Sequence, residues 1–301
     1  MITIRDLAPL RECVGEARGR GDSIGFVPTM GALHEGHLSL VRLAKREAAF
    51  TVVSVFVNPL QFGPTEDFTR YPRDADRDAR ALAAEGVDLL YLPEASRFYP
   101  PDFSTSVEVA RVSDGGEGAR RPGHFRGVAT VVAKLFLQVQ PDVAVFGRKD
   151  LQQVAVVRRL IRDLDFPIRL VVGDTVRESD GLAMSSRNAY LSPDERRSAT
   201  ELSRTLRAAR SRAGDGERDA RRFEEEARRR LEAAGLAVDY VEAVDARTME
   251  RASEVSPGVA LAAAVRLGKT RLIDNVFLVD PEEDPVDPAE SPVDPVKRAK
   301  R

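Results

Sequence analysis

The chain has 301 residues, 43% of them hydrophobic and 31% charged, which is ordinary for a globular protein of one large or two smaller domains. Its net charge of −2 provides no basic field for nucleic acid or an anionic membrane, and its single cysteine, Cys13, excludes an intrachain disulfide. No signal peptide is recognised, and no apolar run approaches the ~20 residues that span a bilayer, so we expect a cytoplasmic protein.

Short apolar runs alternate with amphipathic segments over the first 175 or so residues. The runs predict strands at Ile24–Val27, Thr51–Val57, Leu89–Tyr91, Val143–Phe146 and Ile168–Val172. The segments between them predict helices at Leu38–Glu47, Asp74–Glu85, Val128–Val139 and Leu151–Leu164. Compact apolar strands between helices are typical of a mainly parallel sheet covered on both faces. We therefore expect an α/β, Rossmann-like domain over residues 1–175.

A second region follows, with a different pattern. Ser192-Pro193-Asp194-Glu195 predicts a helix start, with Ser192 as the cap and Pro193 in the first position. Arg- and Ala-rich helices are expected to about Ala234, then strands at Val238–Val244, Gly258–Val265 and Leu272–Val279. These elements predict a smaller α+β domain over residues 176–280 that lids the site. The Pro-rich, polar residues 281–301 are expected to form a disordered tail.

Residues 25–37, with the sequence GFVPTMGALHEGH, predict a turn from a strand into a helix. Such a turn leaves free backbone N–H groups and a helix N-terminus directed at one spot, which suits phosphate. His34 and His37 are three residues apart and so share a helix face. Imidazoles there can donate hydrogen bonds to charge that develops at an attacked phosphorus. Two of the chain's three histidines lie here, which favours a functional site over an incidental surface turn.

Three polar segments follow directly on predicted strands: His34 with His37, Asn58–Gln61, and Gly147–Asp150. Ligands in open α/β sheets gather at the carboxyl ends of the strands. We therefore expect the three segments to converge on one crevice. Taken singly, each segment also fits a plain turn or helix cap, so their agreement on one location carries the prediction.

His34-Glu35-Gly36-His37 resembles the HIGH-type signature of the nucleotidyltransferase superfamily, and the longer PTMGALHEGH resembles the pantoate–β-alanine ligase (pantothenate synthetase) family. Four more segments resemble that family, in its order. They are Phe56–Gly63 (FVNPLQFG), Arg121–Gly127 (RPGHFRG), Phe146–Gln153 (FGRKDLQQ) and Thr175–Asn188 (TVRESDGLAMSSRN). The resemblance has motif-level identity from about residue 23 to 191 and covers the rest only in general layout.

The resemblance implies a two-step reaction without an enzyme nucleophile. Pantoate's carboxylate attacks the α-phosphorus of ATP to give pantoyl adenylate and pyrophosphate. The amine of β-alanine then attacks the acyl carbon, releasing AMP and leaving pantothenate. A homodimer is also implied, with ATP, pantoate and β-alanine as the small-molecule partners.

The resemblance also implies a role for individual residues. The catalytic set is His34, His37, Lys149, Ser185 and Arg187. The ATP-binding set adds Met30, Gly31, Gly36, Gly147, Arg148, Asp150, Val176, Met184 and Ser186. Pantoate is assigned to Gln61, Gln153 and Arg121, and β-alanine to Gln61, while His124 is given a structural role. Neutral amides suit a carboxylate that must stay nucleophilic, because an arginine fork would stabilise the ground state more than the transition state.

Mg²⁺ is expected with ATP, because neutralising a triphosphate with side chains alone is costly. Asp76 and Asp78 are the candidate ligands, with Asp78 preferred. Arg77 stands where some relatives carry another acid. Whether His37 transfers a proton or only donates a hydrogen bond is left open by the sequence.

Two other functions compete with this reading. A nucleotidyltransferase that makes a dinucleotide cofactor would share the HxGH turn but would need a base-stacking pocket, which neither Asn58–Gln61 nor Arg121–Phe125 clearly supplies. A nucleotide-sensing module would be expected to have lost a reactive residue, and none of the five motifs is visibly broken.

Overall fold

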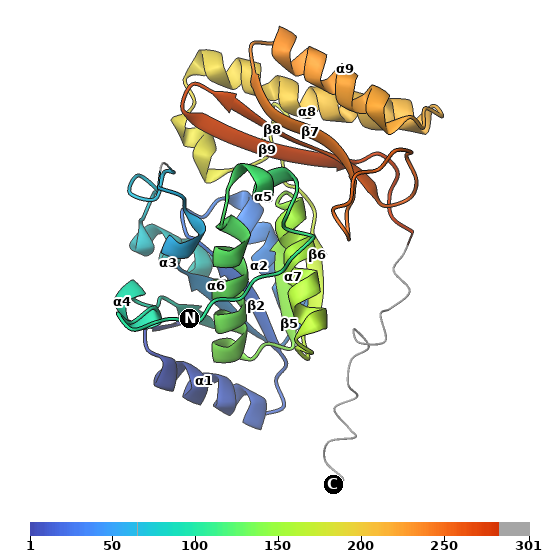
Figure 1. Ribbon diagram of the computed structural model, residues 1–301. Coiled ribbons are helices and arrows are strands. Elements are labelled where there is room, and N and C mark those ends of the chain that lie inside the picture. The colour runs from blue at the N-terminus through green and yellow to red at the C-terminus, as the bar shows by residue number, and fades with distance from the viewer. Residues whose placement is uncertain (65, 283–301) are drawn as a thin grey trace.

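The computed structural model describes residues 1–64 and 66–282 (Figure 1). Most of the expected tail at 281–301 therefore lies outside the described residues. Among those that are described, no helix is both long and apolar enough to cross a membrane.

The first region forms a six-stranded, fully parallel sheet in the order β1-β4-β3-β2-β5-β6. Its strands are β1 (Ile2–Ile4), β2 (Ile24–Thr29), β3 (Phe50–Val55), β4 (Leu89–Tyr91), β5 (Val143–Gly147) and β6 (Arg169–Gly173). The central strands are buried on both faces, which explains their continuous apolar sequences. The predicted Rossmann-like sheet is confirmed.

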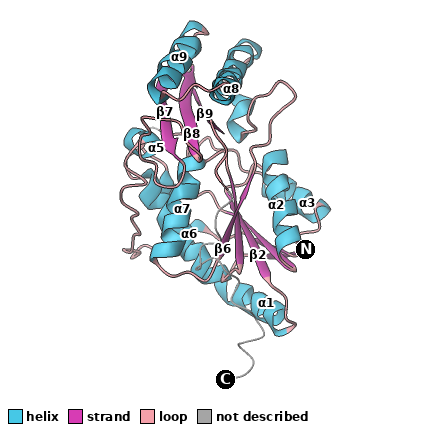
Figure 2. Cartoon of the chain, turned by 90° about the vertical axis from the view of Figure 1, so that its right-hand side faces the viewer, coloured by secondary structure: helices cyan, strands magenta, loops and turns pink. Residues whose placement is uncertain are grey.

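Helices cover both faces of this sheet (Figure 2). One face is packed by α1 (Leu7–Gly19), α6 (His124–Val139) and α7 (Leu151–Asp163), and the other by α2 (Glu35–Glu47) and α3 (Ala75–Ala84). Short elements occupy the connections: η1 (Pro59–Gln61), α4 (Ala95–Phe98), α5 (Gly116–Arg120) and η2 (Ser186–Tyr190). The hydrophobic core is thus divided into two layers by the sheet.

The strand order reverses between β2 and β5. From β2 the chain moves outward through β3 to β4, and it later returns beside β2 as β5 and continues to β6. At such a reversal the connections leave in opposite directions and open a crevice beyond the carboxyl ends of the strands. The HxGH turn follows β2 and the Lys149 loop follows β5, so both phosphate-binding candidates flank this crevice.

The second region is a three-stranded antiparallel sheet backed by two helices. It contains α8 (Pro193–Gly214), α9 (Ala220–Ala233), β7 (Ala237–Asp245), β8 (Val259–Leu267) and β9 (Thr270–Phe277). The α8 start has the expected capping box, in which Ser192 Oγ accepts from the Glu195 N–H and Glu195 Oε2 accepts from the Ser192 N–H. Helices α8 and α9 cover one face of the small sheet, and its other face meets Leu151 at the start of α7.

The sequence did not predict β1 and α1. Strand β1 is only three residues long and lies at the sheet edge with two of them exposed, so its apolar signal is weak. Helix α2 begins three residues earlier than expected, because His34 caps it and Glu35 already belongs to its first turn. Helix α6 likewise begins at His124, ahead of the expected Val128.

Candidate active site

The turn after β2 is held open by a buried carboxylate. Gly31 has φ +82°, and a Cβ there would come within 2.8 Å of Asp78 Oδ2, so only glycine fits. The two oxygens of Asp78 accept hydrogen bonds from the Ala32 N–H (2.9 Å) and the Leu33 N–H (2.8 Å). Asp78 is 2% exposed. Asp78 thus stabilises the turn through both of its carboxylate oxygens. Because the side chain is buried and both oxygens accept hydrogen bonds, its surroundings do not support the expected role as a metal ligand.

The two histidines of the motif fix each other's orientation. His34 Nδ1 accepts from the Gly36 N–H at 3.1 Å, and His37 Nδ1 accepts from the His34 N–H at 3.4 Å. Their ring centroids are 4.1 Å apart. A neutral imidazole whose Nδ1 accepts must carry its proton on Nε2. Each ring therefore keeps one N–H donor, at Nε2.

Both rings are neutral at physiological pH. Burial, aided by the Lys149 ammonium, lowers the pKa of His34 to about 4. Burial, together with His34 and Lys149, lowers the pKa of His37 to about 3. Such groups are poor proton donors near neutrality, but they can donate hydrogen bonds through Nε2.

Gln61 is oriented by the strand-end loop that carries it. Asn58 Nδ2 donates to Gln61 Oε1 at 3.0 Å, while Asn58 Oδ1 accepts from the Tyr99 hydroxyl at 3.0 Å. Gln61 Oε1 thus faces Asn58, and the Gln61 NH₂ group, 3.0 Å from the weak acceptor Met30 Sδ, is the donor that this side chain offers to a ligand. A Cβ at Gly127 would be 2.1 Å from the Leu60 carbonyl oxygen, so glycine there lets α6 approach this loop.

Arg121 and His124 lie beside this loop and are engaged with each other. His124 Nδ1 donates to the Gln61 carbonyl oxygen at 2.8 Å, so its Nε2 is the acceptor for Arg121 Nη1 at 3.1 Å. Burial and the Arg121 charge lower the pKa of His124 to about 4. Arg121 also forms a two-point ion pair with Glu66. These contacts hold the His124 ring between the Gln61 carbonyl group and Arg121.

The loop after β5 presents Lys149 and the start of α7. The Lys149 ammonium is 3.9 Å from Asp150 Oδ1, and the Asp150 side chain makes no capping hydrogen bond. Of the two adjacent glutamines, Gln152 is buried, and its side-chain amide forms hydrogen bonds with the backbone of residues 112–117. Within the described residues the Gln153 amide makes no internal hydrogen bond, which leaves it available to a ligand.

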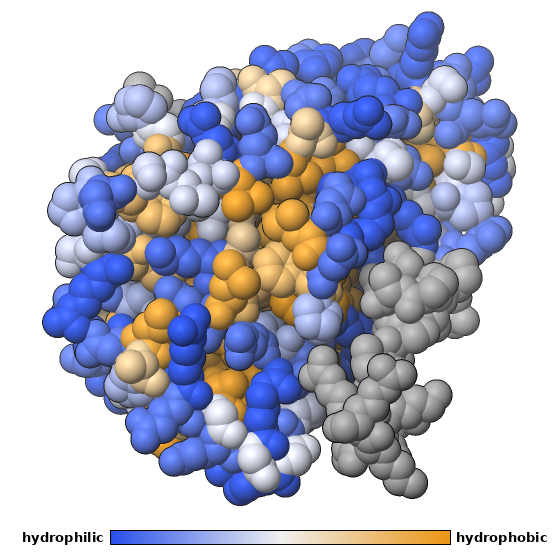
Figure 3. Space-filling model, turned by 60° about the horizontal axis from the view of Figure 1, so that its bottom comes forward, coloured by the Kyte–Doolittle hydropathy of each residue, from blue (hydrophilic) through white to orange (hydrophobic). Residues whose placement is uncertain are grey.

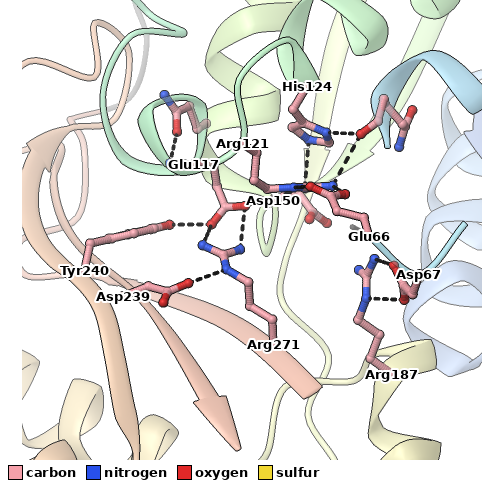
Figure 4. A network of polar contacts seen from close by, with 12 residues as sticks. Glu66, Asp67, Glu117, Arg121, His124, Asp150, Arg187, Asp239, Tyr240 and Arg271 are labelled. Atoms are coloured by element: carbon pink, nitrogen blue, oxygen red, sulfur yellow. Dashed lines mark hydrogen bonds and ion pairs between the residues drawn. The ribbon is translucent and has the colours of Figure 1, made fainter. Parts of the chain in front are cut away.

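Ser185, Ser186 and Arg187, which we call the serine–arginine loop, also line the site. Ser185 Oγ accepts from the Arg187 N–H at 3.3 Å, and Ser186 Oγ lies 3.4 Å from the Tyr71 hydroxyl. Arg187 pairs with Asp67 through two hydrogen bonds. In Figure 4 the pairs Arg187–Asp67 and Arg121–Glu66 lie side by side.

One cavity of about 220 Å³ brings most of the predicted residues together. It is lined by Met30, His34, Gly36, His37, Gln61, Arg121, Gly147, Lys149, Asp150, Gln153, Val176, Met184, Ser185, Ser186 and Arg187. Gly31 and Asp78 line a separate hollow behind the turn, and Arg148 and Asp76 line neither. A second cavity of about 670 Å³ adjoins the first and lies against the small sheet. We refer to these as the small and the large cavity.

Some residues around the cavities were not predicted from the sequence. Tyr71 lines the small cavity, and Glu66 and Asp67 hold the two arginines. Tyr71 lies in a loop with no strand or helix pattern, and both carboxylates lie in a polar loop typical of solvent-exposed turns. Their partners are distant in sequence, so no local signal identifies them.

The crevice at the strand reversal contains the two neutral histidines, the Lys149 ammonium and the loop with Ser185, Ser186 and Arg187. It defines an α/β protein whose site is built to hold phosphates. The chain belongs to the pantoate–β-alanine ligase family, which it matches over residues 2–277 under the description "Pantoate-beta-alanine ligase". It is thus one of the family's ATP-dependent ligases.

Named relatives agree with this membership. Pantothenate synthetase from Desulfitobacterium hafniense is 50% identical over 280 residues, covering 92% of this chain and 99% of the relative. Crystalline pantothenate synthetase from Thermus thermophilus is 48% identical with a TM-score of 0.88, covering 93% of this chain and 100% of the other. The Francisella tularensis ligase, solved with "Beta-gamma ATP and Beta-alanine", is 32% identical with a TM-score of 0.78, covering 92% and 98%.

Proposed function

We propose that this protein joins pantoate and β-alanine to pantothenate, using ATP and releasing AMP and pyrophosphate through a pantoyl-adenylate intermediate. The observation that carries the proposal is the small cavity, which combines hydrogen-bond donors for phosphate with the side-chain amides of Gln61 and Gln153. A dinucleotide-forming enzyme or a nucleotide sensor would not require the paired amides of Gln61 and Gln153.

In the first step the pantoate carboxylate oxygen bonds to the α-phosphorus as the bond to pyrophosphate breaks. The NH₂ groups of Gln61 and Gln153 hold the pantoate carboxylate by hydrogen bonds without neutralising its charge. The Nε2–H groups of His34 and His37 donate to phosphate oxygens, so His37 acts as a hydrogen-bond donor in this proposal. Lys149, Ser185, Ser186 and Arg187 stabilise the pyrophosphate as its charge grows.

In the second step the amine of β-alanine bonds to the acyl carbon, loses a proton and displaces AMP. Gln61 is proposed to contact β-alanine as well, since pantoate's acyl group remains beside it. Met30, Gly36, Gly147, Asp150, Val176 and Met184 complete the nucleotide side of the cavity. No side chain forms a covalent bond in either step.

We propose that Mg²⁺ enters with the triphosphate. The described residues contain no group of three His, Cys, Asp or Glu side chains placed to hold a metal, and both oxygens of Asp78 are engaged. Asp150 lines the cavity and fits as a single carboxylate ligand beside phosphate oxygens and waters. The ion would offset phosphate charge. Asp150→Asn should raise the Mg²⁺ concentration needed for half-maximal rate, and an unchanged requirement would remove this assignment.

Three coarser proposals accompany the activity. We place the protein in the cytoplasm and divide it into residues 1–175 and a lidding region at 176–280. We also propose a homodimer, which family resemblance implies. Apolar residues gather on the face shown in Figure 3. The large apolar side chains Leu137 and Leu164 are 58% and 53% exposed, and a second copy would remove them from water. Sedimentation should give twice the chain mass, and Leu137→Glu should lower it.

The activity is tested by omitting one substrate. With ATP and pantoate but no β-alanine, the protein should release about one pyrophosphate per site and retain an acyl adenylate. Adding β-alanine should then yield pantothenate and AMP. Pyrophosphate that appears only after β-alanine is added would contradict the two-step route. Replacing pantoate with other hydroxy acids tests the choice of substrate.

A further inference from the structure

Strand β9 carries a buried polar pair, Asp274 and Asn275, in the middle of an apolar run. Their exposed fractions are 2% and 5%. Buried polar side chains in native proteins have hydrogen-bond partners, because leaving them unpaired is costly. Their partners lie on two loops outside the small sheet, 97 and 127 residues away in sequence: Arg177, at the start of the second region, for Asp274, and Arg148, in the first region, for Asn275.

Asn275 holds the loop that carries Lys149. Its Nδ2 group donates to the Arg148 carbonyl oxygen at 3.0 Å and to the Lys149 carbonyl oxygen at 2.9 Å. Phe277, two residues on and so on the same strand face, places its ring 5.1 Å from the Arg148 guanidinium carbon. Leu151, the first residue of α7, packs in one cluster with Phe277. This face of β9 therefore fixes residues 148–151.

Asp274 points from the other face of β9 and holds the loop that leads to Ser185. Its Oδ2 and Oδ1 accept from Arg177 Nη1 at 2.7 Å and Nη2 at 3.0 Å. Arg177 also pairs with Ala183 in an isolated β-bridge and donates to the Gly181 carbonyl oxygen at 3.3 Å. The 177–183 turn is thus anchored to β9 at its base, directly before the serine–arginine segment.

We propose that Asp274 and Asn275 are positioning residues that clamp the two phosphate-binding loops in a fixed register. Successive residues of one strand project to opposite faces, so a single rigid element sets the spacing between Lys149 and Ser185–Arg187. The proposal rests on the proposed function for its catalytic meaning. In this proposal the small sheet also aligns the groups that stabilise the leaving pyrophosphate, in addition to covering the site.

Hydrogen exchange on the full chain without substrates tests the clamp. Asn275→Ala should speed amide exchange in residues 148–151 by about tenfold and leave residues 177–184 within about twofold. Asp274→Asn should show the reverse pattern, and it keeps a polar group beside Arg177 so that the chain can fold. The two variants are controls for each other. Equal deprotection of both loops in each variant, or none in either, would overturn the proposal.

A kinetic comparison links the clamp to chemistry. Both variants should slow single-turnover pyrophosphate release by about tenfold or more while the pantoate Kd stays within about twofold. Tyr240→Phe is the matched control, because that hydroxyl also joins the small sheet to the first region, at 3.1 Å from Glu117 Oε1, but reaches α5 (Figure 4). It should leave exchange in both loops unchanged. A wild-type protein that makes no pantothenate would refute the proposed function, whereas the exchange pattern stands or falls independently.

Discussion

The Arg187 guanidinium meets the Asp67 carboxylate in a two-point ion pair, with Nε to Oδ2 at 3.0 Å and Nη2 to Oδ1 at 2.9 Å. One residue earlier in the same loop, Glu66 pairs in the same way with Arg121, at 2.8 and 2.5 Å. Burial by itself would raise the pKa of Asp67, but the hydrogen bonds and charge of Arg187 outweigh it and lower that pKa. Adjacent carboxylates thus neutralise two cations assigned to anionic substrates.

Asp67 and the triphosphate should compete for Arg187. Asp67→Asn removes the competing charge, so we expect the Kd for ATP to fall by roughly threefold to tenfold, the size of a partly exposed ion pair. Calorimetric titration of the protein with ATP measures this directly.

Glu66→Gln is the matched control for that variant. It should leave the ATP Kd unchanged and tighten pantoate instead, because Glu66 engages Arg121 on the pantoate side. Weaker ATP binding in Asp67→Asn would show that the carboxylate orients Arg187 for the phosphates and does not compete with them.

The pKa values of the histidines predict a pH dependence of stability. Folding lowers the pKa from 6.5 to about 4 for His34 and His124 and to about 3 for His37. Between these pH values the unfolded chain binds more protons than the folded chain. The contribution of the three histidines to the free energy of unfolding is therefore complete above pH 6.5 and is lost as the pH falls toward 4. The slope is at most about 1.4 kcal/mol per pH unit for each histidine.

Urea unfolding at pH 7 and pH 5 measures this loss. His37→Gln should show a smaller difference between the two pH values than the wild-type protein, because one depressed group is gone. An equal difference would mean that His37 is not held neutral. Activity should also lack an acid limb near pH 6.5, since proton transfer from a neutral imidazole is not part of the proposed step.

The sequence predicted the parts of this fold that rest on local patterns. Strands β2 to β6 are apolar runs bounded by glycine, proline or charged residues. The HxGH turn, Gln61 and Lys149 each follow such a run. Their convergence could therefore be predicted from the topology of a parallel sheet, without knowledge of any side-chain contact. The bonds of Asp78 to the turn and of Asp67 to Arg187 join residues 45 or more apart. No periodicity encodes such pairs.

The contacts of β9 could not be predicted from local sequence patterns either. The sequence correctly places a strand around Leu272–Val279, but it does not reveal that the two faces of that strand contact different loops. A polar pair inside an apolar strand, here Asp274 and Asn275, is the one signal that was available. It indicates a buried hydrogen-bonding partner without naming it.

Gln152 and Gln153 are adjacent, but we expect their substitution to affect different properties, stability for Gln152 and pantoate binding for Gln153. Gln153→Ala removes an amide with no internal partner among the described residues, so pantoate should bind about tenfold to a hundredfold more weakly with the melting temperature unchanged. Gln152→Ala removes three hydrogen bonds to the backbone and should lower the melting temperature. Thermal unfolding and pantoate titration on both variants separate the two roles. Equal loss of ATP and pantoate affinity in Gln153→Ala would contradict the assignment.

Lys149 should matter most as charge moves onto pyrophosphate. Lys149→Ala should lower the single-turnover rate of adenylate formation by roughly a hundredfold and change the ATP Kd only modestly, because the interaction forms chiefly in the transition state. Lys149→Arg should recover little, since a planar fork does not replace a compact ammonium. Lys269, which lines the large cavity only, provides the control, and Lys269→Ala should retain the wild-type rate. An ATP Kd that collapses in Lys149→Ala, with the rate at saturation intact, would make Lys149 a binding residue and exclude its leaving-group role.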